Sequence, residues 1–151
     1  MIAAIDPGAQ GAIALFYKDG QLAAIHDMPL TRLVGWKHNI ADAAGVRHHL
    51  EGCSAVVIET IQPRPGNGMT AVAASAASWG VLLGAAPAAA VRLVAPQTWT
   101  AALGVGSDKN VHRQAAKGLF GGDWFDRKKD DGRADAALIG WWWLTKGRPG
   151  A

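Results

Sequence analysis

The first eight residues constrain the fold more than any other stretch, because an apolar run there ends on a carboxylate. Residues 1–5 are apolar, Asp6 follows, and Pro7 and Gly8 then turn the chain. A short apolar run bounded by Pro and Gly is typical of a buried β-strand. Open α/β sheets carry their chemistry at the ends of central strands. The sequence therefore predicts a functional position for Asp6, although a carboxylate before Pro-Gly is also a common turn residue.

The later apolar runs predict four more strands. Runs 11–17 and 21–29 are joined by tight turns, so they extend the first strand into an antiparallel meander, whereas residues 28–37 are expected to be irregular. Runs 55–59 and 91–96 alternate with predicted helices. We expect one helix from residue 39 or 42 to residue 50, and another after the loop 64–68. Three more are expected over residues 96–104, from residue 107 or 108 to residue 120, and from residue 131 onward. This order predicts an α/β protein with a mixed five-stranded sheet flanked by helices.

Length and composition favour one domain. The chain has 151 residues, half of them hydrophobic, and we expect a single domain over residues 1–146 with a mobile tail over 147–151. The one cysteine, Cys53, allows no internal disulfide and fits a reducing compartment such as the cytoplasm. No secretion leader is recognised. Residues 69–91 lack charge, but their Ala, Gly and Ser content predicts a buried helix rather than a membrane span.

Three further carboxylates are candidates for the same site as Asp6. Glu59 ends the apolar run 55–58, where a Glu has no turn role. Asp131 and Asp135 are four residues apart, so they share one face of the last predicted helix, and that face continues into apolar residues. A helix cap accounts for Asp131 but not for Asp135. Asp130 is expected to face solvent.

If Asp6, Glu59, Asp131 and Asp135 converge, they repel one another, so the site needs cations. Two unit charges about 4 Å apart cost about 4 kcal/mol at an effective dielectric constant of about 20. Oxygen ligands favour Mg²⁺ or Mn²⁺, and a pair of such ions supports phosphodiester hydrolysis. Without metal, Asp135→Asn is therefore expected to melt no lower than the wild type.

Several of these segments resemble the RuvC-like Holliday junction resolvases, above all the small forms encoded by bacteriophages. The resemblance is carried by Ile5–Asp6–Pro7–Gly8 with Gly11, by residues 56–59, and by residues 128–136, and it extends over nearly the whole chain. It implies an RNase H-like fold and a homodimer that cuts four-way DNA junctions with Mg²⁺, leaving 5′-phosphate ends. It also implies a bacterial or phage-infected host cytoplasm.

The resemblance assigns roles to single residues. It makes Asp6, Glu59 and Asp135 metal ligands, with two Mg²⁺ ions expected and Mn²⁺ as a substitute. Bacterial members place the last two acidic ligands three residues apart, where this chain has Gly132, so we take Asp131, rather than Asp130, as the fourth ligand. Lys109, at a predicted helix start, is the candidate to contact a phosphate near the cut, or is an exposed surface lysine.

Five further residues are candidates for binding nucleic acid. Met69 could enter the junction centre, or could pack at the start of its helix. The basic candidates could neutralise phosphates, or could form a solvated surface: Arg64, Lys128, Lys129 and Arg133.

Other functions fit parts of the pattern. An actin-like phosphotransferase would also use Asp6 and Gly8, but it needs far more chain. A non-catalytic junction-binding protein would not need all four acidic residues. A broader branched-DNA or RNA-directed nuclease stays open, because the sequence does not define the substrate or any preferred cutting site.

Overall fold

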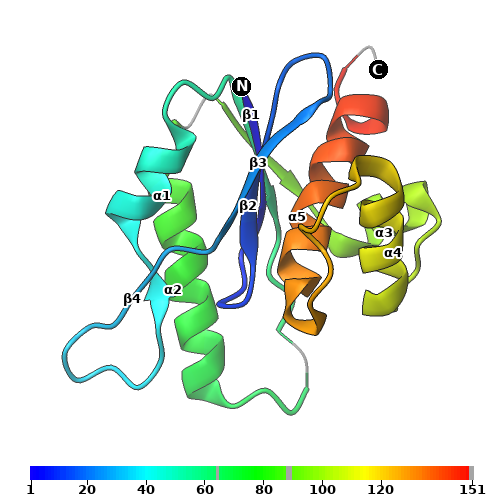
Figure 1. Cartoon of the computed structure of the whole chain (residues 1–151). Helices are drawn as coiled ribbons and strands as arrows, with labels where there is room; N and C mark the ends of the chain where they lie inside the picture. Colours follow the sequence, from blue (N-terminus) through cyan, green and yellow to red (C-terminus); the bar gives the residue numbers. More distant parts are fainter. Residues whose placement is uncertain (64, 88–89, 150–151) are drawn as a thin grey trace.

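The computed structural model describes residues 1–63, 65–87 and 90–149 (Figure 1). A five-stranded sheet has the order β3-β2-β1-β6-β7. Its strands are β1 (Ile2–Asp6), β2 (Ala12–Phe16), β3 (Leu22–Asp27), β6 (Ala55–Glu59) and β7 (Val91–Val94). The helices are α1 (Ala43–Leu50), α2 (Met69–Ala85), α3 (Pro96–Leu103), α4 (Lys109–Phe120) and α5 (Asp131–Trp142), with a 3₁₀ turn at Lys128–Asp130 before α5 and a π-helical turn at Trp143–Gly147 after it.

The sheet is mixed, as the sequence predicts. Strand β1 pairs antiparallel with β2, and β2 pairs antiparallel with β3. On its other side β1 pairs parallel with β6, and β6 pairs parallel with β7. The α/β fold class with three antiparallel strands followed by α/β alternation is therefore confirmed.

Helices cover both faces of the sheet (Figure 1). Helices α1 and α2 pack on the face lined by Ala3, Ile5 and Val56. Helices α3, α4 and α5 pack on the other face, lined by Ala4 and Val57. Because side chains alternate along a strand, Asp6 shares the face of Ala4, and Glu59 shares the face of Val57. Both carboxylates therefore point toward the side that α5 covers.

Two glycines let α5 lie against the sheet. A Cβ on Gly132 would overlap the carbonyl oxygen of Gln10 in the turn between β1 and β2. A Cβ on Gly140 would overlap the ring of Phe16. The backbone of α5 thus contacts the first hairpin directly, and this contact places Asp135 beside the end of β1.

Local signals explain most element boundaries. Asp42 accepts a hydrogen bond from the N–H of Gly45 and begins α1, and Asp108 accepts one from Asn110 and begins α4. The structure differs from the prediction at residues 28–37, because β4 (Leu30–Thr31) pairs with β5 (Ile40–Ala41) to close a projecting loop. Two-residue strands are too short to leave a periodic pattern in the sequence.

None of the helices in the described part of the chain has the length and apolar content to cross a bilayer. The single domain and the mobile tail stay predictions; residues 150 and 151 of that tail lie outside the described residues.

Candidate metal and nucleic-acid site

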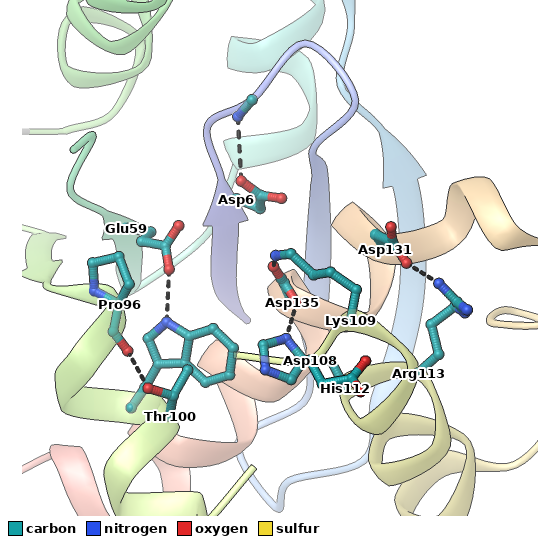
Figure 2. Close-up of polar contacts among 12 residues, drawn as sticks. Asp6, Glu59, Pro96, Thr100, Asp108, Lys109, His112, Arg113, Asp131 and Asp135 are labelled. Atoms are coloured by element: carbon teal, nitrogen blue, oxygen red, sulfur yellow. Dashed lines mark hydrogen bonds and ion pairs between the residues drawn. The ribbon is translucent and has the colours of Figure 1, made fainter. Parts of the chain in front are cut away.

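Three of the predicted carboxylates meet at the end of the central strands. Ile5 lies opposite Ile58 in the parallel pair of β1 and β6, so the next residues, Asp6 and Glu59, are neighbours. Asp135 reaches the same place from α5, where its side chain is buried. Figure 2 shows the three side chains around the ammonium group of Lys109. The parallel strand ends thus bring together residues that are distant in the sequence.

The charges of these carboxylates interact. Burial, with repulsion from Asp135 and Glu59, raises the pKa of Asp6 to about 7. Its carboxylate accepts one hydrogen bond from the described residues, from the N–H of Gly8 at 3.3 Å. Burial also raises the pKa of Glu59, together with repulsion from Asp135, although a hydrogen bond from Trp99 opposes this. The site therefore holds more negative charge than its surroundings neutralise.

Asp135 differs from the other two because Lys109 and His112 contact it. Lys109 forms an ion pair with its Oδ2, and His112 Nδ1 lies 2.7 Å from its Oδ1. The other ring nitrogen of His112 lies 3.0 Å from the carbonyl oxygen of Gly106. Burial disfavours the charge on His112, but the hydrogen bonds to Asp135 and Gly106 raise its pKa above the ordinary value. The negative charge of Asp135 is therefore paired with Lys109 and held by His112.

An indole from α3 holds Glu59. The Nε1–H of Trp99 donates to Glu59 Oε1 at 2.7 Å (Figure 2). The same ring packs edge-on against His112, with centroids 5.2 Å apart. Trp99 and His112 are both buried, so these two aromatic residues link the supports of Glu59 and Asp135. The sequence analysis did not identify either residue.

Asp131 and Asp130 have separate partners. The carboxylate of Asp131 forms an ion pair with Arg113 of α4, a partner that the sequence analysis did not identify. Asp130 is 1% exposed, so the expectation that it faces solvent is wrong. Its carboxylate accepts hydrogen bonds from the backbone N–H and the guanidinium of Arg127, which satisfies it inside the 3₁₀ turn. Burial opposes the charge, but these bonds hold the pKa of Asp130 below its ordinary value.

A ligand three residues before Asp135 is sterically excluded. That position is Gly132, where any side chain would collide with the backbone of the β1–β2 turn. An acidic partner for Asp135 on this face of α5 therefore has to come from another position, and Asp131 stays the predicted fourth ligand.

The predicted nucleic-acid-binding residues lie in different surroundings. Met69 is 88% exposed at the start of α2, which contradicts the alternative that it packs there. Lys128 and Lys129 are exposed in the 3₁₀ turn. Arg133 forms an ion pair with Asp27 at 2.6 Å. Arg64 lies outside the described residues.

A cavity of about 240 Å³ opens beside the acidic residues. Asp6 and Glu59 line one side of it, and residues of the loop after β6 line the other, among them Thr60, Gln62 and Asn67. The amides of Gln62 and Gln97 hydrogen-bond to each other at 2.8 and 2.9 Å. An extended ligand in this cavity would lie directly against two of the three carboxylates.

The donor set fits a hard divalent cation. It consists of carboxylate oxygens, and burial together with repulsion from Asp135 and Glu59 raises the pKa of Asp6 in spite of the nearby Lys109. Across the described residues, however, no three His, Cys, Asp or Glu side chains are arranged as a metal centre. Asp135 is instead engaged by Lys109 and His112.

No family model and no curated protein matches the chain. Solved structures do. RuvC from T. thermophilus in complex with a Holliday junction substrate is 16% identical, with a TM-score of 0.63, over 97% of this chain and 96% of that one. Another Thermus thermophilus RuvC structure is 17% identical, with a TM-score of 0.59, over 91% of each chain. The chain therefore has the fold of RuvC, an RNase H-like mixed α/β architecture.

Proposed function

We propose that the chain is a divalent-metal-dependent endonuclease that cuts four-way DNA junctions. The observation that carries this proposal is the cluster of Asp6, Glu59 and Asp135 at the end of the central strands. The chain shares its fold with T. thermophilus RuvC, and the similar RuvC structure is a complex with a Holliday junction substrate.

The three clustered carboxylates would hold Mg²⁺, or Mn²⁺ in its place, and Asp131 would join them as a fourth ligand on leaving Arg113. Two such cations, when bound, activate a water molecule and stabilise the leaving oxygen in phosphodiester hydrolysis. The chain's own residues prepare the site. Trp99 fixes the orientation of Glu59 through its N–H, and His112 fixes Asp135.

Lys109 is the residue that we assign to the phosphate beside the cut. Burial disfavours its charge, but Asp135, Asp6 and Glu59 raise its pKa, so it stays protonated at neutral pH. Its side chain is 52% exposed, and its ammonium forms an ion pair with Asp135. Lys128 and Lys129 add exposed positive charge before α5. Met69 and Arg64 belong to the segment that we expect to approach the junction centre.

A homodimer suits this substrate, because a four-way junction offers two equivalent strands. Helix α2 supports dimer formation, because all of its residues are uncharged. Its Gly80 and Gly84 are exposed, and a methyl group at either position would have no neighbouring atom within 4 Å. Close approach of a second copy along that face would bury it. We place the activity in the cytoplasm of a bacterial or phage-infected cell, where Cys53 would remain a free thiol.

The test is cleavage of a synthetic four-way junction, a linear duplex of the same arms and an RNA–DNA hybrid, each with and without Mg²⁺. We expect cutting of the junction alone, only with metal, and loss of cutting but not of binding in Asp6→Asn. Equal rates on duplex and junction would indicate a general nuclease, and preferred cutting of the hybrid would indicate an RNA-directed enzyme. Metal-independent binding without any cutting would indicate a junction-binding protein.

A further inference from the structure

A second cavity, of about 360 Å³, lies next to the carboxylates on the side of α1 and α2. It is lined by residues of the projecting loop between β4 and β5, of the turn after β1 and of helix α2. Polar and basic side chains of the loop line it: Arg32, Lys37, His38 and Asn39. No Asp or Glu occurs among the described residues that line it.

The described residues supply no ion-pair partner for the positive charge of this cavity. None of the ion pairs among the described residues includes Arg32 or Lys37, and both side chains belong to exposed residues. In its hydrogen bonds to the described residues, Arg32 uses only its Nε, which donates to Asn39 Oδ1 at 3.1 Å. The terminal guanidinium nitrogens therefore keep their N–H donors for a ligand. Lys109 and Arg113, by contrast, each pair with a carboxylate.

This cavity adjoins the one that contains the acidic residues. Pro7 and Ser75 line both. The turn that follows Asp6 thus separates a negatively charged cavity from a positively charged one. A polyanion whose scissile bond lies against Asp6 and Glu59 would pass over Pro7 into the basic cavity.

We propose that Arg32 and Lys37 form a phosphate subsite that holds one backbone phosphate of the DNA strand next to the strand position that is cut. This inference rests on the proposed function and extends it to a specific set of residues. The guanidinium of Arg32 offers paired N–H donors, which match two oxygens of a phosphodiester, and Asn39 orients it. Lys37 contributes a point charge without a fixed direction.

The experiment compares Arg32→Ala/Lys37→Ala with a charge-matched control, Lys18→Ala/Arg47→Ala. Lys18 and Arg47 are exposed and lie near the opposite end of the sheet from Asp6. Binding of a four-way junction is measured in EDTA over a range of salt concentrations. We expect a dissociation constant about tenfold higher for the subsite variant, and a salt slope lower by about 0.9, as for one lost phosphate contact. The control should match the wild type.

A second measurement identifies the phosphate. Single phosphates around the cleaved position are replaced by uncharged methylphosphonates, one at a time. We expect one position at which the replacement weakens wild-type binding about tenfold, and no such effect at that position in the subsite variant. Positions that contact other residues should weaken both proteins equally, which also shows that the variant is folded.

The outcomes separate the two proposals. If the wild type cuts junctions and the subsite variant retains wild-type affinity, salt slope and phosphate sensitivity, the subsite is refuted and the nuclease proposal stands. The variant could also bind the junction as tightly as the wild type does but fail to bind inorganic phosphate, which the wild type binds. This result would refute the assignment to a DNA strand and would indicate a site for a free anion. A wild type that binds no DNA refutes both.

Discussion

Two carboxylates of one cluster should respond in opposite ways to the loss of their charge when no metal is present. Asp6 has neighbours that repel it, because burial, Asp135 and Glu59 raise its pKa from 3.8 to about 7. Asp135 has neighbours that attract it, because it contacts Lys109 and the buried His112. We therefore predict that Asp6→Asn stabilises the metal-free chain and that Asp135→Asn destabilises it.

The magnitude for Asp6 follows from linkage between protonation and folding. The unfolded chain releases the Asp6 proton near pH 3.8, whereas the folded chain keeps it up to about pH 7. Between these values the folded state binds more protons, so stability falls as pH rises. The loss reaches roughly 4 kcal/mol above pH 7, at about 1.36 kcal/mol per pH unit of pKa difference. Asp6→Asn escapes this loss, so its advantage over the wild type should grow by about 3 kcal/mol between pH 5 and pH 8.

Asp135→Asn should cost about 3 kcal/mol or more, because it leaves the buried imidazole of His112 without its anionic partner. The structure thus reverses the expectation, based on crowded acidic residues alone, that this variant melts no lower than the wild type. Lys109 and His112 of α4 contact the Asp135 carboxylate and oppose its repulsion from Asp6 and Glu59.

The assay is urea unfolding in EDTA at pH 5, 6, 7 and 8 for the wild type, both variants and Glu51→Gln. Glu51 is exposed after α1 and far from the site in the fold, so its variant serves as the control for a lost surface charge. If Asp6→Asn is less stable than the wild type at pH 8, or if its advantage does not change with pH, the charge cluster does not exist as described.

Two further predictions concern the supports of the site. Trp99→Phe removes the N–H donor to the Glu59 carboxylate and should lower the rate of junction cleavage about tenfold. The acid limb of its pH–rate profile should move to higher pH. The matched control is Trp79→Phe, because the Trp79 indole donates to the Glu59 backbone carbonyl, and this variant should leave the acid limb in place. Gly132→Ala should lower the free energy of unfolding by about 3 kcal/mol, because its Cβ overlaps the β1–β2 turn. Gly118→Ala in α4, with open space around it, should raise stability by about 0.5–1 kcal/mol. Equal melting temperatures for these two glycine variants would contradict the close contact of α5.

Most of the fold could be predicted from the sequence because its strands are unbroken apolar runs with clear turns at their ends. Runs that finish on Asp6 and Glu59 needed only the parallel pairing of their strands to become neighbours. The short β4–β5 ladder has no such signal, since two residues show no period. The burial of Asp130 could not be predicted, because an acidic residue that is hydrogen-bonded within its own turn has no sequence pattern that distinguishes it from an exposed one in a basic segment.

The supporting residues of the site were beyond sequence reasoning for a different reason. Trp99 and His112 come from α3 and α4, and the direction in which those helices cross the sheet is a matter of packing. The sequence does carry one usable sign. His112 and Ala116 are four residues apart and are the buried residues of α4, so a histidine on that face has to find a partner inside the protein.

The alignment of β6 against β1 has a consequence for how samples of this protein are judged. The pairing of residues between β1 and β6 places Asp6 next to Glu59. Because successive side chains of a strand point to opposite faces of the sheet, a shift of β6 by one residue would turn Glu59 away from Asp6. Such a slipped molecule would keep its helices and its hydrogen-bonded sheet. Circular dichroism would therefore rate it as intact although it had lost half of its strand-borne ligands.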